Sequence, residues 1–190
     1  MPHKEIQNQR LVPDDCILVV VDVQDRLMSS MEEKVKELVL RNISILIQVA
    51  HHLKIPILHT EQYPKGLGKT LNEINSLSSG LIPLEKISFS CMGSEEFTKR
   101  IRSLKRTKVL LAGAETHVCC YQTGLDLLDN GFIVYTITDA TCSRKKNNWK
   151  IALASFRDAG AYLSSTEQAV FDLIRVAGTN DFKFISSLVK

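Results

Sequence analysis

Short apolar runs alternate with longer amphipathic stretches along the chain. Residues 16–23, CILVVVDV, form a nearly continuous run rich in β-branched side chains. Continuous apolarity is typical of a strand that is buried on both faces of a parallel sheet. In a strand with one solvent-exposed face, apolar and polar residues alternate instead. Comparable runs predict further strands at residues 55–59, 107–113, 132–138 and 161–163, and the alternating polarity of residues 85–90 predicts another.

The stretches between these runs have the period of amphipathic helices. Ser30 is a candidate N-cap for a helix that reaches about Leu53, and Ser94 is a candidate N-cap for a helix over residues 95–104. A third helix is predicted from about His117 to Asn130, where Asn-Gly forms a suitable C-cap. The apolar stripe of the first helix comprises Met31, Val35, Leu38, Ile45, Leu46 and Val49. The last two helices are predicted at residues 147–159 and 165–177.

Six strands that alternate with helices predict an α/β fold. Because helical crossovers force neighbouring strands to be parallel, we expect a doubly wound three-layer sandwich with a six-stranded, mostly parallel, Rossmann-like sheet. Residues 1–14 are polar and end in Pro-Asp, so they are predicted to be a flexible N-terminal arm. Residues 15–190 are predicted to form a single domain, because their length suits one substantial core.

Composition narrows the class of protein. The chain of 190 residues is 44% hydrophobic and 24% charged, which is typical of a soluble globular protein. The net charge of +3 is dispersed, so we expect no nucleic-acid partner. The longest apolar run, residues 17–21, is too short to cross a bilayer, and the N-terminus has no apolar signal region. Five cysteines without zinc or disulfide spacing favour a reducing compartment, and we predict a cytoplasmic protein with no membrane partner.

Candidate chemistry lies where apolar strands end. Residues 107–128 predict a strand that runs into a helix, with Cys119 and Cys120 at the joint. The dipole at a helix N-terminus stabilises a thiolate, so a thiol there is a candidate nucleophile. Asp22 and Lys86 also follow apolar strands. If these side chains converge, the carboxylate can accept the thiol proton, and the ammonium group stabilises the negative charges.

Three motifs make the chain similar to a known family. They are VVVDVQ at residues 19–24, PLEK at 83–86 and GAETHVCCYQTGLDLL at 113–128. In that order they resemble the isochorismatase-like cysteine hydrolases, and the likeness runs from about Asp15 to Ile174. Residues 60–68, TEQYPKGLG, and 139–144, DATCSR, look most like the small isochorismatase-domain-containing branch. The resemblance therefore points to the catalytic machinery more than to a substrate.

The resemblance implies a role for each motif residue. Cys119 corresponds to the nucleophile, Asp22 to the general base and Lys86 to their electrostatic partner. The family also has a cis peptide bond that does not precede proline, and here it falls between Ala114 and Glu115. Its implied purpose is to turn the backbone N–H groups of Glu115 and Cys119 toward an oxyanion. The expected reaction is hydrolysis of a small-molecule amide or related C–N substrate through a thioester.

Four more residues are candidates for the substrate pocket. Gln24 is expected to be a hydrogen-bonding residue behind the catalytic groups, and His117 is expected at the pocket edge. Tyr63 and Phe89 are either a hydrophobic substrate wall or ordinary core, and the sequence leaves both interpretations open.

A metal site and a cofactor are not expected. Family members that hydrolyse nicotinamide resemble one another in an Asp-x-His metal motif, whereas residues 60–64 here are Thr-Glu-Gln-Tyr-Pro. His51, His52 and His59 do not recreate the spacing of that motif. We therefore predict metal-independent chemistry.

Several simpler interpretations stay open. Cys119 alone is also compatible with a buried structural thiol, and Cys120 is expected to pack in the core. Asp22 alone is compatible with a loop cap, and residues 144–146 with a solvated basic loop. The whole protein is compatible with a catalytically idle interaction protein, or with a hydrolase of vinyl ethers such as isochorismate. A nuclease is disfavoured by the dispersed charge, and we expect a homo-oligomer, a dimer or higher.

Overall fold

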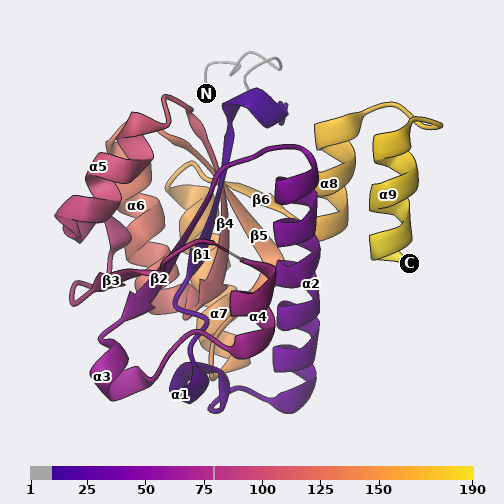
Figure 1. The fold of residues 1–190 in the computed structure, drawn as a ribbon. Helices are drawn as coiled ribbons and strands as arrows, with labels where there is room; N and C mark the ends of the chain where they lie inside the picture. The colour runs from indigo at the N-terminus through magenta and orange to yellow at the C-terminus, as the bar shows by residue number, and fades with distance from the viewer. Residues whose placement is uncertain (1–9, 79) are drawn as a thin grey trace.

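The computed structural model describes residues 10–78 and 80–190, and within them it shows one six-stranded sheet between two layers of helices (Figure 1). The strand order is β3-β2-β1-β4-β5-β6, and every pairing between neighbouring strands is parallel. The strands are β1 (Cys16–Val21), β2 (Ile57–Gln62), β3 (Leu84–Lys86), β4 (Lys108–Ala114), β5 (Ile133–Cys142) and β6 (Tyr162–Ser164). The predicted α/β fold is confirmed, and the sheet is parallel throughout.

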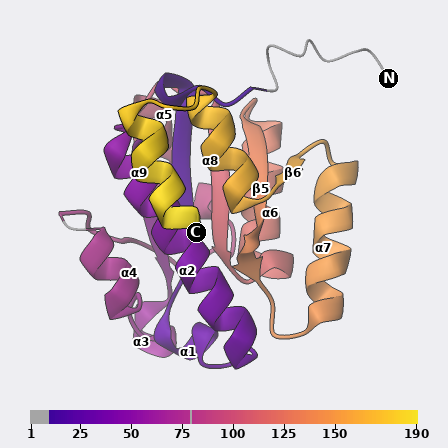
Figure 2. The same cartoon turned by 90° about the vertical axis from the view of Figure 1, so that its right-hand side faces the viewer.

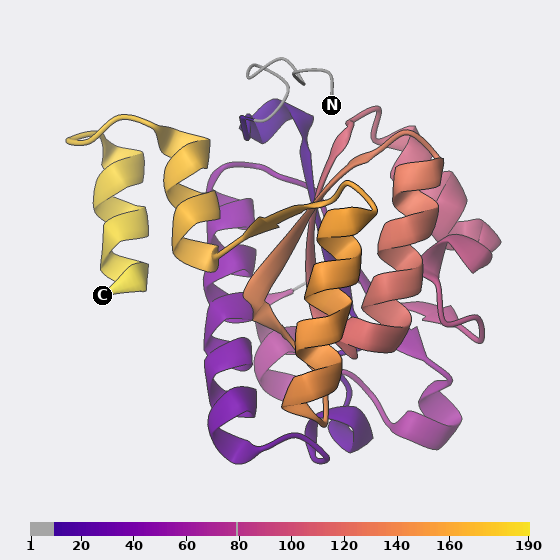
Figure 3. The same ribbon diagram turned by 180° about the vertical axis from the view of Figure 1, so that it is seen from behind.

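Helices cover both faces of the sheet. Figure 3 shows the long helix α2 with α8 and α9 on one side and the helices α5, α6 and α7 on the other. In Figure 2, α8 and α9 lie beside α2, with which both are in contact. The longer helices are α2 (Glu33–His52), α5 (Glu95–Ser103), α6 (Tyr121–Asp129), α7 (Lys146–Asp158), α8 (Thr166–Ile174) and α9 (Asn180–Val189). The short ones are α1 (Asp25–Met28), α3 (Pro64–Leu67) and α4 (Asn72–Leu77).

Strand β1 lies in the middle of the sheet, and all six of its residues are buried. Leu18 and Val20 belong to the hydrophobic cluster under α2, while Ile17 and Val19 belong to the cluster under α5, α6 and α7. Because successive side chains of a strand point to opposite faces, a strand between two helical layers must be apolar at every position. This explains the unbroken run at residues 16–21.

Several predicted boundaries were wrong. Helix α2 begins at Glu33, not after Ser30, and Leu38 is 48% exposed although it was placed on the apolar stripe. Strand β2 continues to Gln62, into the stretch that the Gly and Pro residues had indicated as a loop, because its last three residues pair with β3. Residues 87–90 alternate in polarity but lie outside any strand. Helix α9 was not predicted.

The predicted flexible arm at residues 1–14 lies mostly outside the described residues. Within the part that is described, Leu11 is only 1% exposed and its N–H donates to Oδ2 of Asp172 at 2.7 Å. Its carbonyl oxygen accepts from the guanidinium of Arg175 at 3.1 Å. Leu11 is therefore packed against the domain, although it lies within the range predicted as an arm.

Candidate active site

Asp22, Lys86 and Cys119 meet at the edge of the sheet formed by the carboxyl ends of the strands. Asp22 directly follows β1, Lys86 is the last residue of β3, and Cys119 lies in a π-helical turn, Thr116–Cys120, after β4. Nζ of Lys86 lies 2.7 Å from Oδ2 of Asp22, and neither side chain is exposed. Ligand sites of open α/β sheets form at this edge, so the predicted convergence has a structural basis.

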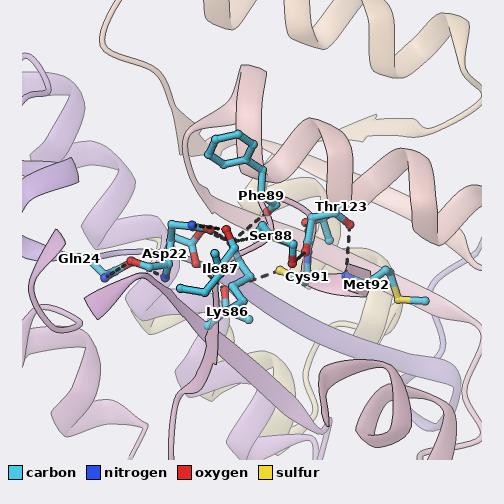
Figure 4. A network of polar contacts seen from close by, with 12 residues as sticks. Asp22, Gln24, Lys86, Ile87, Ser88, Phe89, Cys91, Met92 and Thr123 are labelled. Atoms are coloured by element: carbon cyan, nitrogen blue, oxygen red, sulfur yellow. Dashed lines mark hydrogen bonds and ion pairs between the residues drawn. The ribbon is translucent and has the colours of Figure 1, made fainter. Parts of the chain in front are cut away.

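The Lys86 ammonium group is surrounded by acceptors (Figure 4). Besides Asp22, it donates to Oε1 of Gln62 at 2.8 Å and to the carbonyl oxygen of Phe89 at 2.9 Å, with the Ser88 carbonyl at 3.3 Å. Burial lowers the pKa of Lys86, but the charge of Asp22, the neighbouring Cys91 and Cys119 and the hydrogen bond to Asp22 together outweigh burial, and the pKa is raised. Lys86 is therefore held as a cation that supports Asp22, with its three hydrogens committed to protein acceptors.

The Cys119 side chain is 5% exposed and sits in the electrostatic field of this ion pair. Burial and then the charge of Asp22 raise the pKa of the Cys119 thiol, and Lys86 lowers it by less. The expectation that a helix N-terminus stabilises a thiolate here is therefore wrong for the resting protein, because desolvation and the neighbouring carboxylate dominate. Cys120 is fully buried, in agreement with the predicted core position.

The backbone before Cys119 makes a sharp turn. The peptide bond between Ala114 and Glu115 is cis. Just before it, Gly113 has a φ of +126°, and a Cβ at this position would lie 2.1 Å from the carbonyl oxygen of Val21. Only glycine permits both this conformation and this close approach of β4 to β1.

Glu115 is anchored by a residue that was predicted to be solvated. Nε of Arg144 donates to Oε1 of Glu115 at 2.7 Å, and a second guanidinium nitrogen donates to Oε2 at 3.3 Å. The Glu115 side chain is 8% exposed, whereas that of Arg144 is 58% exposed. This two-pronged ion pair ties the turn before Cys119 to the segment that follows β5, so Arg144 is not part of a free basic loop.

His117 is fixed by two partners and does not face Cys119 as a base. Its Nδ1 lies 2.9 Å from Oγ of Ser143, and its Nε2 lies 3.2 Å from Nδ2 of Asn148. Both ring nitrogens of His117 are therefore engaged in hydrogen bonds with these two side chains. His117 therefore links the turn to the start of α7.

Gln24 lies behind the site and is completely buried. Its Oε1 accepts from the N–H of Gln62 at 2.7 Å, and its Nε2 donates to the carbonyl oxygens of Gln62 and Gly68 at 3.0 and 2.6 Å. All of these partners belong to the backbone of β2 and the segment after it. Gln24 therefore positions that segment from behind the site, in the hydrogen-bonding role that was expected of it.

Tyr63 and Phe89 contact Lys86 through their backbones. The N–H of Tyr63 donates to the Lys86 carbonyl oxygen at 2.9 Å, and the Phe89 carbonyl accepts from the Lys86 ammonium. The two side chains are 50% and 53% exposed, so they are not core residues. Figure 4 shows the Phe89 ring pointing away from the polar network. A substrate-wall role for either ring stays a prediction.

Thr60, Gln62 and Cys91 complete the network, and the sequence did not single them out. Thr60 Oγ1 donates to Oδ1 of Asp22 at 2.7 Å and lies 3.6 Å from the sulfur of Cys91. The missed signal was the length of β2: if the strand is extended to residue 62, Thr60 and Gln62 fall beside Asp22 and Lys86 at the same sheet edge.

Two further findings concern the described residues only. Within residues 10–78 and 80–190, no three His, Cys, Asp or Glu side chains gather in a way that could hold a metal ion. In the same part of the chain, no helix combines the length and the apolarity that a membrane span requires.

Solved structures with this fold include two informative ones. The MAR1 ribonuclease of Caenorhabditis elegans is 31% identical, with a TM-score of 0.87 over 95% of this chain and 92% of that chain. The YcaC gene product of Escherichia coli, described as an octameric hydrolase of unknown specificity, has a TM-score of 0.87 over 94% of this chain and 88% of that one. At 23% identity, the latter likeness shows the fold alone.

Related sequences and a family model match nearly the whole chain or most of it. The secreted isochorismatase effector Isc1 of Phytophthora sojae is 36% identical over 185 residues, which cover 95% of this chain and 87% of the relative. Isochorismatase domain-containing protein 2 of Bos taurus is 36% identical over 181 residues, which cover 95% of this chain and 86% of the relative. The model of the isochorismatase domain matches residues 16–168. The chain therefore belongs to the isochorismatase family.

Proposed function

We propose that the protein is a metal-independent cysteine hydrolase that cleaves a small amide or related C–N substrate. The observation that supports this most directly is the fully buried Asp22–Lys86 ion pair beside the Cys119 thiol, whose pKa is raised by burial and by the charge of Asp22 and lowered to a smaller extent by Lys86. A buried carboxylate beside a thiol that rests in the protonated form is the arrangement that general-base activation requires.

The reaction begins with proton transfer from Cys119 to Asp22. The sulfur then attacks the substrate carbonyl carbon and forms a C–S bond, and Asp22 returns the proton to the departing nitrogen as the C–N bond breaks. Water attacks the resulting thioester, releases the acid and restores the thiol. Lys86 stays charged throughout and keeps the carboxylate and thiolate charges balanced.

The N–H groups of Glu115 and Cys119 are the proposed donors to the oxyanion that forms when sulfur attacks. In this proposal, the role of the Glu115 side chain is to hold the first of these donors in place through its ion pair with Arg144. Donors that are fixed before the reaction stabilise the transition state without a reorganisation cost.

A panel of small amides, carbamates and nicotinamide-like compounds tests this function with wild type, Cys119→Ala and Cys120→Ala. We expect wild type and Cys120→Ala to hydrolyse the same compounds, and Cys119→Ala to lose turnover while it keeps the wild-type circular dichroism. Trapping of the acyl group on Cys119 by mass spectrometry identifies the thioester. Wild-type rates in folded Cys119→Ala contradict the mechanism.

The same panel separates the competing functions. Hydrolysis of isochorismate that survives Cys119→Ala favours the vinyl-ether hydrolase, which needs no thiol nucleophile. Cleavage or steeply salt-dependent binding of RNA favours an activity like that named for the Caenorhabditis elegans relative. Absence of every activity in folded wild type favours the catalytically idle interaction protein.

Assembly and location belong to the same proposal. A homo-oligomer is supported by the octameric state named for the Escherichia coli structure with the same fold. A cytoplasmic location stays a prediction, and one relative is named as a secreted effector. Light scattering on the purified protein measures the number of subunits directly.

A further inference from the structure

Thr60 stands out among the residues around the site because it connects two strands through a catalytic side chain. It is 1% exposed and lies opposite Val21 in the parallel pairing of β2 with β1. Its hydroxyl donates to Oδ1 of Asp22 at 2.7 Å, and its carbonyl oxygen accepts from the Asp22 N–H at 3.2 Å. Thr60 therefore holds both the backbone and the side chain of Asp22.

The backbone of Asp22 needs such a hold. Its φ is +50°, which is the left-handed region that residues with a side chain rarely adopt. Conformations of this kind persist where neighbouring contacts determine them, and they cluster at functional sites. The two links to Thr60, together with the contact between Lys86 and Oδ2, leave the carboxylate one orientation.

The donor and the acceptor can be assigned in each hydrogen bond that links Cys91, Thr60 and Asp22. A hydroxyl has one hydrogen, and the Thr60 hydrogen goes to Asp22 because a carboxylate accepts only. The sulfur of Cys91, 3.6 Å from Thr60 Oγ1, must then be the donor in their contact. Burial raises the pKa of Cys91 to about 11, so its thiol keeps that hydrogen at neutral pH. The Cys91 N–H is itself held by Oγ1 of Thr123 at 2.9 Å.

We propose that Thr60 is a positioning residue for the hydrolytic reaction: backed by the Cys91 thiol, its hydroxyl orients the carboxylate of Asp22 for its work as a base. This inference rests on the proposed hydrolase function and adds to it a residue that acts through Asp22. Hydrogen bonds to the charged form of an acid favour that form, and here donors reach both carboxylate oxygens.

The charged and titratable groups that face Asp22 come from three elements. Lys86 of β3 contacts it directly, Cys119 and Cys120 face it from the π-helical turn, and Cys91 faces it from a 3-10 turn, Cys91–Gly93. None of these is removed by a substitution of Thr60. A change in pH dependence after such a substitution therefore reports the loss of the hydroxyl.

The pH dependence of kcat/KM in Thr60→Val and Thr60→Ser tests the proposal. In Thr60→Val the Asp22 carboxylate loses a hydrogen-bond donor and takes up a proton more readily. The acid limb of the kcat/KM profile should therefore move to higher pH by about one unit. We expect kcat to fall about tenfold or more with KM little changed, because the base is misoriented. Thr60→Ser keeps the hydroxyl and should keep the wild-type limb. An unmoved limb in folded Thr60→Val, or an equal shift in Thr60→Ser, overturns the proposal.

Cys91→Ala is a second test variant, which leaves Thr60 and its contribution to folding in place. It removes the donor to the Thr60 hydroxyl, so the acid limb should move in the same direction by a smaller amount. If Thr60→Val does not fold, Cys91→Ala tests the proposal by itself. An acid limb of kcat/KM identical to that of wild type then overturns the proposal.

A stability measurement separates this inference from the proposed function. Urea midpoints of wild type, Thr60→Val, Asp22→Asn and the double variant form a cycle that needs no substrate. We expect Thr60→Val to lower the midpoint less in the Asp22→Asn background, because the lost hydrogen bond is then to a neutral group. If no amide is hydrolysed, the proposed hydrolase function is contradicted, whereas this cycle still tests the hydrogen bond between Thr60 and Asp22. Strict additivity overturns the positioning role.

Discussion

Nζ of Lys86 lies 2.7 Å from Oδ2 of Asp22 although a whole strand separates the two residues in the sheet. Asp22 follows β1 and Lys86 ends β3, and the side chain of Lys86 passes the end of β2 on its way to the carboxylate. The ion pair therefore links β1 and β3 across the end of β2. Because both side chains are completely buried, the pair leads to the first prediction.

Lys86→Met should destabilise the protein strongly. It leaves the Asp22 carboxylate buried without its cation, and breaking a buried ion pair from one side costs about 3–5 kcal/mol. The double variant Asp22→Asn with Lys86→Met buries no net charge and should be more stable than Lys86→Met alone. Urea unfolding of both variants checks this, and a double variant that is less stable than the single one contradicts the account.

Gly113→Ala should be far more damaging than the same change at another glycine with positive φ. The new Cβ would lie 2.1 Å from the Val21 carbonyl oxygen, whereas at Gly131, with a φ of +83°, nothing lies within 4 Å. We expect a loss of at least about 3 kcal/mol for Gly113→Ala, from strain and backbone displacement, and about 1 kcal/mol for Gly131→Ala. Thermal unfolding of the pair measures the difference, and equal losses contradict it.

Arg144→Gln should lower activity more than stability. The Arg144 side chain is 58% exposed, so its ion pair with Glu115 contributes no more than about 1 kcal/mol to folding. It nevertheless fixes the turn that precedes Cys119, and we expect kcat to fall about tenfold. Lys145→Gln removes the same charge from the neighbouring, exposed position and is the matched control. Equal activity in both variants contradicts a role for Arg144.

Stability should fall as the pH rises above 9. Burial raises the pKa of Cys16 and Cys91 to about 11 and that of Cys142 to about 12, from an ordinary value of 9.0. Between pH 9 and about 11 the unfolded chain releases these protons and the folded chain keeps them, so unfolding becomes more favourable. Each thiol contributes a slope of up to about 1.4 kcal/mol per pH unit. Urea unfolding between pH 7 and 10.5 measures it.

Cys16→Val is the control for the alkaline decline. It removes one buried thiol at the start of β1, where a β-branched side chain suits the strand. Its unfolding free energy should decline with a shallower slope above pH 9 than that of wild type. A slope identical to wild type contradicts the assignment of the decline to buried thiols.

Local signals in the sequence were sufficient where one element carried all the information. The run at 16–21 could be identified as a doubly buried strand because its unbroken apolar pattern lies within the strand itself. Ser94 could be identified as a helix cap because the hydrogen bond from the Phe97 N–H to Ser94 Oγ joins residues three positions apart. The end of β2 could not be predicted in this way. Residues 60–62 are extended because they pair with β3, which lies more than twenty positions later in the chain. Turn-forming residues beyond Gln62 therefore misplaced the boundary.

Sequence and structure contributed differently to the site. The sequence by itself determined the parallel α/β fold, the family and the motif positions of Asp22, Lys86 and Cys119, because strand periodicity and short motifs are local properties. Only the tertiary structure decided that the Cys119 thiol has a raised pKa, that Lys86 is saturated with acceptors, and that Thr60 and Arg144 hold Asp22 and Glu115. These properties depend on burial and on distances between strands far apart in the chain, which packing alone establishes.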